Sequence, residues 1–442
     1  MLKSIFGAIA PVKVFSRFTF NKLFTFLLFY AKITSMNIIK INDNSNKLFY
    51  IGGVVRDELL GRKSIDIDIT YVGNAIEYCS KFGEVVQENP DFGTVRVAIN
   101  PLPNFSHSHS DNCEILLSHR ERGQKVTVDF ASTRSESYPR KGHLPVVEKI
   151  GCSLKEDVMR RDFTVNALAK SVTTGEIVDY VGGLEDLKNK KLRVLHDESF
   201  IDDPTRIIRG LKFATRFGFE LEEHTKKLQD EYLANINYDM SYKRVKKELI
   251  ETFSLNSQSA FKAFIDQKIY KLITLNDVKM PKVNIEGLVN DYYTPHPSYG
   301  HPLPVGAREE KKQPSYPVAL WLIYVGILGD LSRLPLTKIE QKILDDVPKE
   351  VLKTDFELYK TFQNARIETI LLYAILKDEA GARHYLDDLQ KIKLEITGKD
   401  LQNLGIKPSP EYQKIFDEVS KVKLKNPSIT KEDEIKLVKE LV

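Results

Sequence analysis

The stretch YIGGVVRDELLGRKSIDIDIT, residues 50–70, decides the fold. It reads as a strand, a glycine turn, a short helix and a second strand, residues 65–71, that carries Asp66 and Asp68. Alternate side chains of a strand point to one face, so these two carboxylates would stand side by side. Because Mg²⁺ is held by one or two carboxylates together with water and substrate phosphates, the pair predicts a metal–phosphate site. The alternative is an exposed edge strand with solvated aspartates.

The glycine pair upstream favours the metal–phosphate interpretation. Gly52 and Gly53 would present unhindered backbone N–H groups near a helix start, where a triphosphate would bind. Arg56 and Asp57 follow within one helical turn.

A third carboxylate is predicted further along the chain. Residues 125–131, KVTVDFA, alternate as a strand does and carry Asp129 in the middle. An aspartate that faces Asp66 and Asp68 would complete a metal site. The alternative is an ordinary aspartate near a strand end.

The segment RRDFTVNALA, residues 160–169, combines a buried side with polar groups. On a helix, Asp162 and Asn166 would share one face because they are four residues apart. Such a face is able to bind a ribose hydroxyl, while arginines hold phosphates. The alternative is an arginine-rich helix start with an ordinary salt bridge. Residues 134–157 before it are loop-like and would form a mobile element over a phosphate site.

From residue 200 the pattern becomes helical. In FIDDPTRIIRGLKFATRFGFEL, residues 200–221, apolar residues form one stripe, and Asp203 before Pro204 suits a helix N-cap followed by proline. The same segment predicts a basic face made of Arg206, Arg209, Lys212 and Arg216.

The whole-chain composition sets broad limits. A chain of 442 residues suggests two or more domains, and a net charge of +4 restricts any nucleic-acid surface to a local basic patch. Three cysteines without metal-ligand spacing indicate a reducing compartment and no zinc site. Residues 1–42 are basic and free of acid, as in an organelle transit peptide, or they precede a true start at Met36.

Five motifs in order resemble the class II tRNA nucleotidyltransferase and poly(A) polymerase family: GGVVRD…DIDIT, RRDFTVNALA, DYVGGLEDL, DDPTRIIRGLKFATRFGF and RVKKEL. The resemblance implies an α+β fold, with a small mixed-sheet head followed by an all-α neck, body and tail. The implied boundaries are 1–46 for an extension or transit peptide, 47–180 for the catalytic head, 181–255 for the neck, 256–390 for the body and 391–442 for a tRNA-binding tail.

The resemblance also implies a role for each site residue. Asp66 and Asp68 would hold two Mg²⁺ ions. Asp129 is added as the candidate third catalytic carboxylate from its strand pattern, not from the resemblance. The nucleotide would be bound by Gly52, Gly53, Arg56, Arg160, Arg161, Asp162, Asn166, Asp203, Arg206 and Arg209. Among these, Asp203 and Arg206 match the family's Glu-Asp-x-x-Arg element, which selects the incoming base, although Asp202 stands here in place of the leading Glu.

The implied activity is template-independent addition of CCA, or of the terminal A alone, to the 3′ end of tRNA. The enzyme would use CTP and ATP, release pyrophosphate and have no membrane partner. The long segment 134–157 favours A addition, because CC-adding enzymes lack it. A poly(A) polymerase and a CC-adding enzyme are near alternatives, and a non-catalytic RNA-binding protein is a remote one. The expected compartment is the cytoplasm, or a mitochondrion or other organelle if residues 1–42 are a transit peptide. Lys421, Lys423 and Lys425 are candidate tRNA contacts in the tail.

Overall fold

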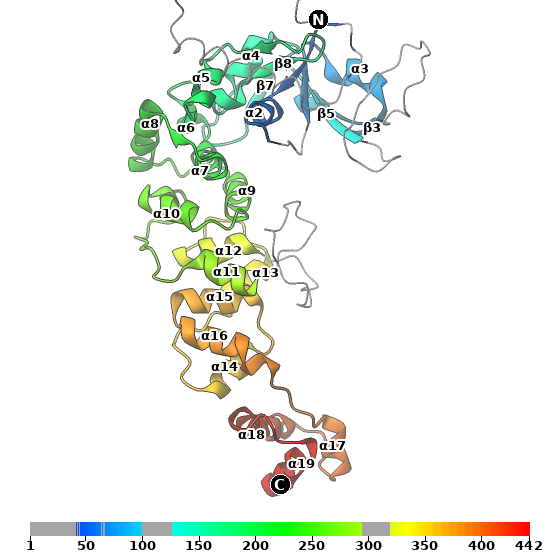
Figure 1. Cartoon of the computed structure of the whole chain (residues 1–442), viewed down its shortest axis with the longest axis vertical. Helices are drawn as coiled ribbons and strands as arrows, with labels where there is room; N and C mark the ends of the chain where they lie inside the picture. Colours follow the sequence, from blue (N-terminus) through cyan, green and yellow to red (C-terminus); the bar gives the residue numbers. More distant parts are fainter. Residues whose placement is uncertain are drawn as a thin grey trace, which may run out of the picture. The chain divides into compact units, whose positions relative to one another are not determined.

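The computed structural model describes residues 41, 43, 45–62, 64, 67–99, 126–293 and 319–442. Asp66 and nearly all of the leader therefore lie outside the described residues. The described chain divides into two compact units (Figure 1). One runs up to Asp202 and adds Glu220–Lys226; the other comprises Asp203–Phe219 and Lys227–Val442.

A mixed β-sheet organises the first unit. Within the described residues it has seven strands in the order β3-β4-β5-β2-β1-β8-β9. They are β1 (Leu48–Ile51), β2 (Asp68–Tyr71), β3 (Glu84–Asn89), β4 (Thr94–Ile99), β5 (Val126–Ser132), β8 (Ala169–Ser171) and β9 (Ile177–Val178). The β2–β5 pair is parallel and its neighbours are antiparallel. The strands predicted before the glycine turn and around Asp129 are thus confirmed.

The first unit also contains five short helices among its described residues: α2 (Gly53–Leu59), α3 (Ala75–Cys79), α4 (Leu154–Met159), α5 (Gly183–Lys188) and α6 (Ser199–Asp202). Ile51 of β1 packs with Leu154 and Val158 of α4 and with Ala167 and Ala169, so α4 is fixed against the strand that leads into the glycine turn. A minor parallel pair joins β10 (Lys191–Leu192) to β11 (Glu220–Leu221).

The segment expected to be a loop, 134–157, is instead a hairpin followed by a helix. Strands β6 (Arg134–Ser137) and β7 (Val146–Ile150) pair antiparallel. Ser153 then starts α4 with a capping box, in which it exchanges hydrogen bonds with Glu156. Pro139, Gly142 and Pro145 suggested a loop because they occupy the turn between the two strands. The strands themselves have four and five residues, too few for a clear periodic pattern.

The second unit is helical. Its elements are α7 (Thr205–Phe217), α9 (Tyr242–Phe253), α10 (Gln258–Asp266), α11 (Ile285–Tyr292), α12 (Leu320–Val325), α13 (Lys338–Asp345), α14 (Asp355–Phe362), α15 (Ile367–Leu376), α16 (Glu379–Asp387), α17 (Gly398–Asn403), α18 (Glu411–Lys425) and α19 (Lys431–Leu441), while α8 (Glu223–Ala234) crosses the boundary. Rings of Phe253, Phe261, Phe264 and Tyr324 pack together where α9, α10 and α12 meet. The α+β fold class is confirmed, and no described helix is long and apolar enough to cross a bilayer.

Two predictions about basic residues in this unit are wrong. Lys212, expected on a basic face of α7, is only 8% exposed. Its Nζ lies 2.7 Å from Glu248 Oε2 and 2.5 Å from Glu251 Oε2, both on α9. Arg206 is also buried, at 3% exposure. In the tail, Lys423 is buried with its Nζ 2.7 Å from Glu434 Oε1, so it is not available to bind tRNA.

Candidate active site

Two carboxylates lie on neighbouring strands at the centre of the sheet. Asp68 is the exposed first residue of β2, and the parallel register pairs it with Asp129 on β5. The predicted third carboxylate therefore lies beside Asp68. Its oxygens are also bound by Arg96 of β4, with Nε 2.6 Å from Oδ1 and Nη2 2.8 Å from Oδ2.

The carboxylate oxygens of Asp68 and Asp129 suit a hard divalent cation. Carboxylate oxygens are the ligands that Mg²⁺ and Ca²⁺ prefer, and Asp68 and Asp129 supply them. Over the described ranges no group of three His, Cys, Asp or Glu side chains comes together, and Asp66, the expected partner of Asp68, lies outside those ranges.

The glycine turn holds an arginine closely. Gly52 has φ 71° and ψ −121°, a conformation that favours glycine. A Cβ at this position would lie 3.0 Å from Arg161 Nη1 and 3.3 Å from the Asn166 carbonyl oxygen. The Gly52 N–H, predicted to be open to phosphate, instead donates to Leu168 O at 3.0 Å. The turn therefore brings a guanidinium next to the start of α2.

Arg56 lies inside the head, at 4% exposure. Its Nε and Nη2 donate to Asp57 Oδ1 at 2.9 and 2.7 Å, and its Nη1 donates to Asn166 Oδ1. Asn166 Nδ2 in turn donates to Asp162 Oδ1 at 2.9 Å. Arg56 thus orients the amide of Asn166, whose other end orients Asp162.

The expected helix around Asp162 and Asn166 is wrong, although the two side chains do meet. The structure has only a 3₁₀ turn at Thr164–Asn166, followed by β8. The Phe163 N–H donates to Asp162 Oδ1 at 2.8 Å, which competes with helical hydrogen bonding at this point.

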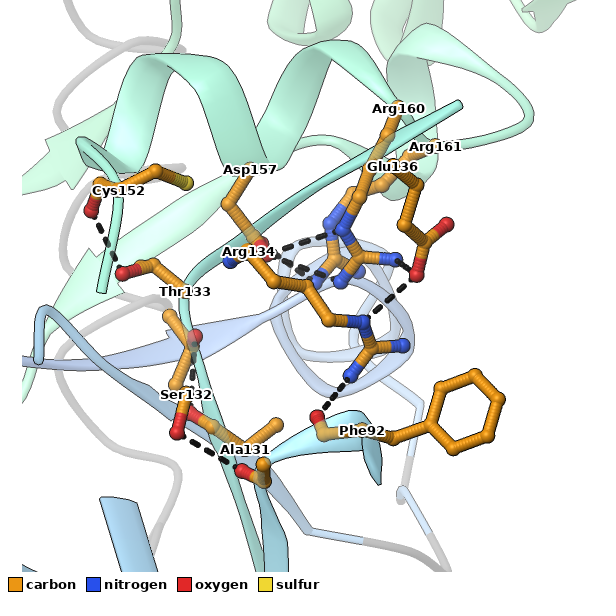
Figure 2. Close-up of polar contacts among 12 residues, drawn as sticks. Phe92, Ala131, Ser132, Thr133, Arg134, Glu136, Cys152, Asp157, Arg160 and Arg161 are labelled. Atoms are coloured by element: carbon orange, nitrogen blue, oxygen red, sulfur yellow. Dashed lines mark hydrogen bonds and ion pairs between the residues drawn. The ribbon is translucent and has the colours of Figure 1, made fainter. Parts of the chain in front are cut away.

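Asp157, which sequence reasoning missed, is the centre of the polar network in Figure 2. This carboxylate is fully buried. Its Oδ1 accepts from Arg160 Nε and Nη2 at 3.1 and 2.9 Å and from the Arg134 N–H at 3.1 Å; its Oδ2 accepts from Arg161 Nη2 at 3.2 Å. Because Arg160 Nη1 also donates to Glu136 at 3.1 Å, the network joins the hairpin to α4. The sequence did contain a signal for this network: Asp157 stands three and four residues before Arg160 and Arg161, a spacing that brings side chains together on a helix.

The negative charge of Asp157 is balanced by the two guanidinium groups that bind it. Burial opposes ionisation of Asp157, but the guanidinium groups of Arg161 and Arg160 outweigh it and lower the pKa of the carboxyl below its ordinary value. Burial lowers the pKa of Arg161, against the opposing pull of Asp157 and Asp68. Asp157 therefore keeps two arginines in place in an environment that disfavours charge.

A cleft of about 440 Å³ opens between the hairpin, α4 and α6, a volume that suits a small-molecule ligand. It is lined by Glu136, Tyr138, Lys141, Arg160, His196 and Asp202, among others. Lys141 Nζ lies 2.5 Å from Asp202 Oδ1 and 2.9 Å from Glu198 Oε2. Asp202 is thus bound to the tip of the hairpin.

The residues expected to select the base begin the second unit. Asp203 Oδ1 accepts from the Thr205 N–H at 3.1 Å and from Thr205 Oγ1 at 2.6 Å. The N-cap of α7 is Pro204 and its first residue is Thr205, so the prediction of Asp203 as N-cap and Pro204 as first helical residue is wrong by one position. Asp203 Oδ2 accepts from Arg244 Nη2 at 2.5 Å. Arg209 Nη1 lies 3.1 Å from Glu248 Oε1. Arg244 was not predicted as a site residue, because 41 residues separate it from Asp203.

The head of this chain matches a known protein family. The Poly A polymerase head domain profile covers residues 48–193, the part of the chain that holds the sheet and the arginine network. Residues 48–193 belong to the Poly A polymerase head domain family. The family resemblance stated from the sequence is therefore confirmed.

Curated members of this family align to different extents. An A-adding tRNA nucleotidyltransferase of Aquifex aeolicus is 43% identical over 189 residues, which cover 41% of this chain and 20% of that protein. One from Halalkalibacterium halodurans is 27% identical over 420 residues, covering 89% and 88%. An A-adding tRNA nucleotidyltransferase of Geobacter sulfurreducens is 28% identical over 427 residues, which cover 88% of this chain and 44% of that protein. The chain therefore spans only a fifth of the Aquifex protein and less than half of the Geobacter protein.

A solved structure shares the family fold over the whole length. The apo form II of a CCA-adding enzyme superposes with a TM-score of 0.68 at 21% identity, covering 97% of both chains. At this identity the similarity establishes the fold alone, a mixed-sheet head followed by helices.

Proposed function

We propose that this chain is a tRNA 3′-end nucleotidyltransferase that adds CCA, or the terminal A alone, from CTP and ATP. The observation that carries the proposal is the register of Asp68 opposite Asp129, in a head of the Poly A polymerase type. The names of the relatives support it, since those aligned above are A-adding enzymes and others are CCA-adding enzymes.

The residues of the head would bind and orient the triphosphate. Asp68, together with Asp66, would hold Mg²⁺, which supplies charge neutralisation at the phosphates and activation of the 3′-hydroxyl when it is bound. Arg161 lies against the glycine turn, where its guanidinium would donate to phosphate oxygens. Asp162 and Asn166 would contact the ribose hydroxyls, and the buried Arg56 would keep Asn166 in position.

Asp203 and Arg206 would select the base. A carboxylate accepts from the exocyclic amino group of C or A, and an arginine donates to the neighbouring ring nitrogen. U and G present the opposite polarity at that edge and would leave buried groups unpaired, which disfavours them strongly.

Single-nucleotide incorporation tests the proposal. We would offer each labelled NTP to a tRNA that ends at the discriminator base, to one that ends in CC, and to an unrelated RNA. A addition to the CC-ended tRNA alone identifies an A-adding enzyme, and three additions to the shorter tRNA identify a CCA-adding enzyme. Absence of incorporation into either tRNA, with Mg²⁺ present, would overturn the proposal.

Poly(A) polymerase is the second candidate, because the head profile is that of the Poly A polymerase head domain. It predicts long A tails on the unrelated RNA as well as on tRNA. The same experiment therefore separates the two activities.

A further inference from the structure

Three charged side chains lie in a row across the middle of the large sheet. Strands β4, β5 and β2 are neighbours, and their registers pair Arg96 with Asp129 and Asp129 with Asp68. Because residues that are directly paired on adjacent strands point to the same face, all three side chains lie on one face. Asp129 therefore stands between a cation on one side and the carboxylate of the proposed metal site on the other.

Arg96 binds both oxygens of the Asp129 carboxylate. Its Nε lies 2.6 Å from Oδ1 and its Nη2 lies 2.8 Å from Oδ2, the bidentate geometry in which a planar guanidinium matches a carboxylate. These are the same two atoms with which Asp129 would bind Mg²⁺. A metal ion that binds Asp129 must therefore displace the guanidinium, or share an oxygen with it next to a second positive charge.

The ion pair between Arg96 and Asp129 is weak enough to be displaced. Their side chains are 47% and 44% exposed, so water and salt screen the attraction between them. An exposed pair of this kind shifts an equilibrium by no more than about 5-fold. By contrast, the side chains of the Arg56–Asp57 pair in the same unit are 5% and 4% exposed, as expected for a fixed structural contact.

We propose that Arg96 competes with the divalent cation for Asp129 and thereby sets the metal affinity of the site. This inference rests on the proposed function, in which Asp68 and Asp129 help to bind Mg²⁺. While the Asp129 carboxylate is bound to Arg96, it contributes little to metal binding, and the cation gains this ligand only when the guanidinium turns away. Arg96 therefore affects the concentration of Mg²⁺ that the enzyme requires rather than the rate of the loaded enzyme.

Two other roles for Arg96 would leave the same geometry. A purely structural ion pair across the strands would contribute to stability and have no effect on metal binding. Repulsion of the cation by the charge of Arg96 alone would weaken metal binding without any part for Asp129. Competition differs from both, because its effect requires the Asp129 carboxylate and disappears when that carboxylate is replaced.

Binding of Mn²⁺ to the full chain, followed by the electron paramagnetic resonance signal of the free ion, measures metal affinity without turnover. Mn²⁺ suits the same oxygen ligands as Mg²⁺. Arg96→Gln should bind Mn²⁺ about 3- to 5-fold more tightly than the wild type. Arg96→Met should show the same gain, and it decides the question if Arg96→Gln does not fold. Lys191→Gln is the matched control, since it breaks another cross-strand ion pair, with Glu220 at 2.9 Å, and should leave the affinity unchanged.

The Asp129→Asn background separates competition from charge repulsion. In this background Arg96→Gln should no longer raise the affinity for Mn²⁺, because the carboxylate for which Arg96 competes is gone. An equal gain in both backgrounds would contradict competition at Asp129. An unchanged affinity of Arg96→Gln in the wild-type background would reduce the pair to a structural contact.

Asp68→Asn keeps failure of this inference apart from failure of the proposed function. If Asp68→Asn binds Mn²⁺ as tightly as the wild type, the metal site assigned to Asp68 is wrong, and the inference about Arg96 falls with it. If Asp68→Asn weakens binding while Arg96→Gln changes nothing, the metal site stands and only the competition is wrong.

Discussion

Asp68 and Asp129 lie opposite each other on the parallel strands β2 and β5, and the Asp129 carboxylate is at the same time bound by two donors of Arg96. Asp129 is thus available as a site carboxylate only if Arg96 shares it or releases it. The pair is half exposed, so its contribution to stability is about 1 kcal/mol or less. Any large effect of changing Asp129 would therefore come from function.

Asp129→Asn is expected to lower kcat for nucleotide addition by about 100-fold, because the carboxylate would help to hold the Mg²⁺ that neutralises the negative charge of the phosphates. Arg96→Gln serves as the control and should leave kcat nearly unchanged. Both variants should unfold in urea close to the wild-type midpoint. Full turnover by Asp129→Asn would reduce Asp129 to an ion-pair partner of Arg96.

Asp157→Asn should lower the free energy of unfolding by about 3 kcal/mol, because it leaves two partly buried guanidinium groups without their fully buried carboxylate. It should also raise the KM for ATP, since Arg160 and Arg161 lose their orientation. Urea unfolding and initial rates measure the two effects. Lys155→Ala, a change at an exposed position of the same helix, should alter neither the free energy of unfolding nor the KM for ATP. If Lys155→Ala lost as much stability as Asp157→Asn, the loss would come from α4 in general and not from the arginine network.

The same carboxylate predicts a pH dependence. The pKa of Asp157 is lower in the folded protein than its ordinary value of 3.8, so the folded state binds the proton less well than the unfolded chain does. Its stabilising contribution is therefore complete above pH 3.8 and is lost as the pH falls further. The stability difference between wild type and Asp157→Asn should be constant from pH 7 to about 5 and shrink below pH 3.8. A constant difference at acid pH would contradict the assignment.

Gly52→Ala should impair nucleotide use, because its Cβ would lie 3.0 Å from Arg161 Nη1 in addition to the strain at φ 71°. Gly61→Ala is a suitable control, since Gly61 has φ 69° but a Cβ at this position would have no heavy atom within 4 Å. Both should lose about 1 kcal/mol of stability from backbone strain. Only Gly52→Ala should raise the KM for ATP, and equal KM values would contradict the placement of Arg161 at a triphosphate site.

Short sequence patterns predicted those features of the head that depend only on residues close together in the sequence. The alternation in KVTVDFA placed Asp129 in a strand, and the structure adds its register with Asp68. The link between Asp203 and Arg244 spans 41 residues and depends on how α7 packs on α9, which no short pattern encodes. The basic face of α7 was misjudged for a related reason: Lys212 is buried because Glu248 and Glu251 of α9 accept its charge.

Asp68 has the central role in the proposed function, as a carboxylate of a metal-dependent nucleotidyltransferase. The decisive measurement is transfer of labelled ATP to a CC-ended tRNA with added Mg²⁺ or with EDTA, for wild type and for Asp68→Asn. We expect transfer by the wild type only when Mg²⁺ is present, and a loss of about 1,000-fold or more in Asp68→Asn with tRNA binding retained. Substantial transfer by Asp68→Asn, or transfer by the wild type in EDTA, would contradict it.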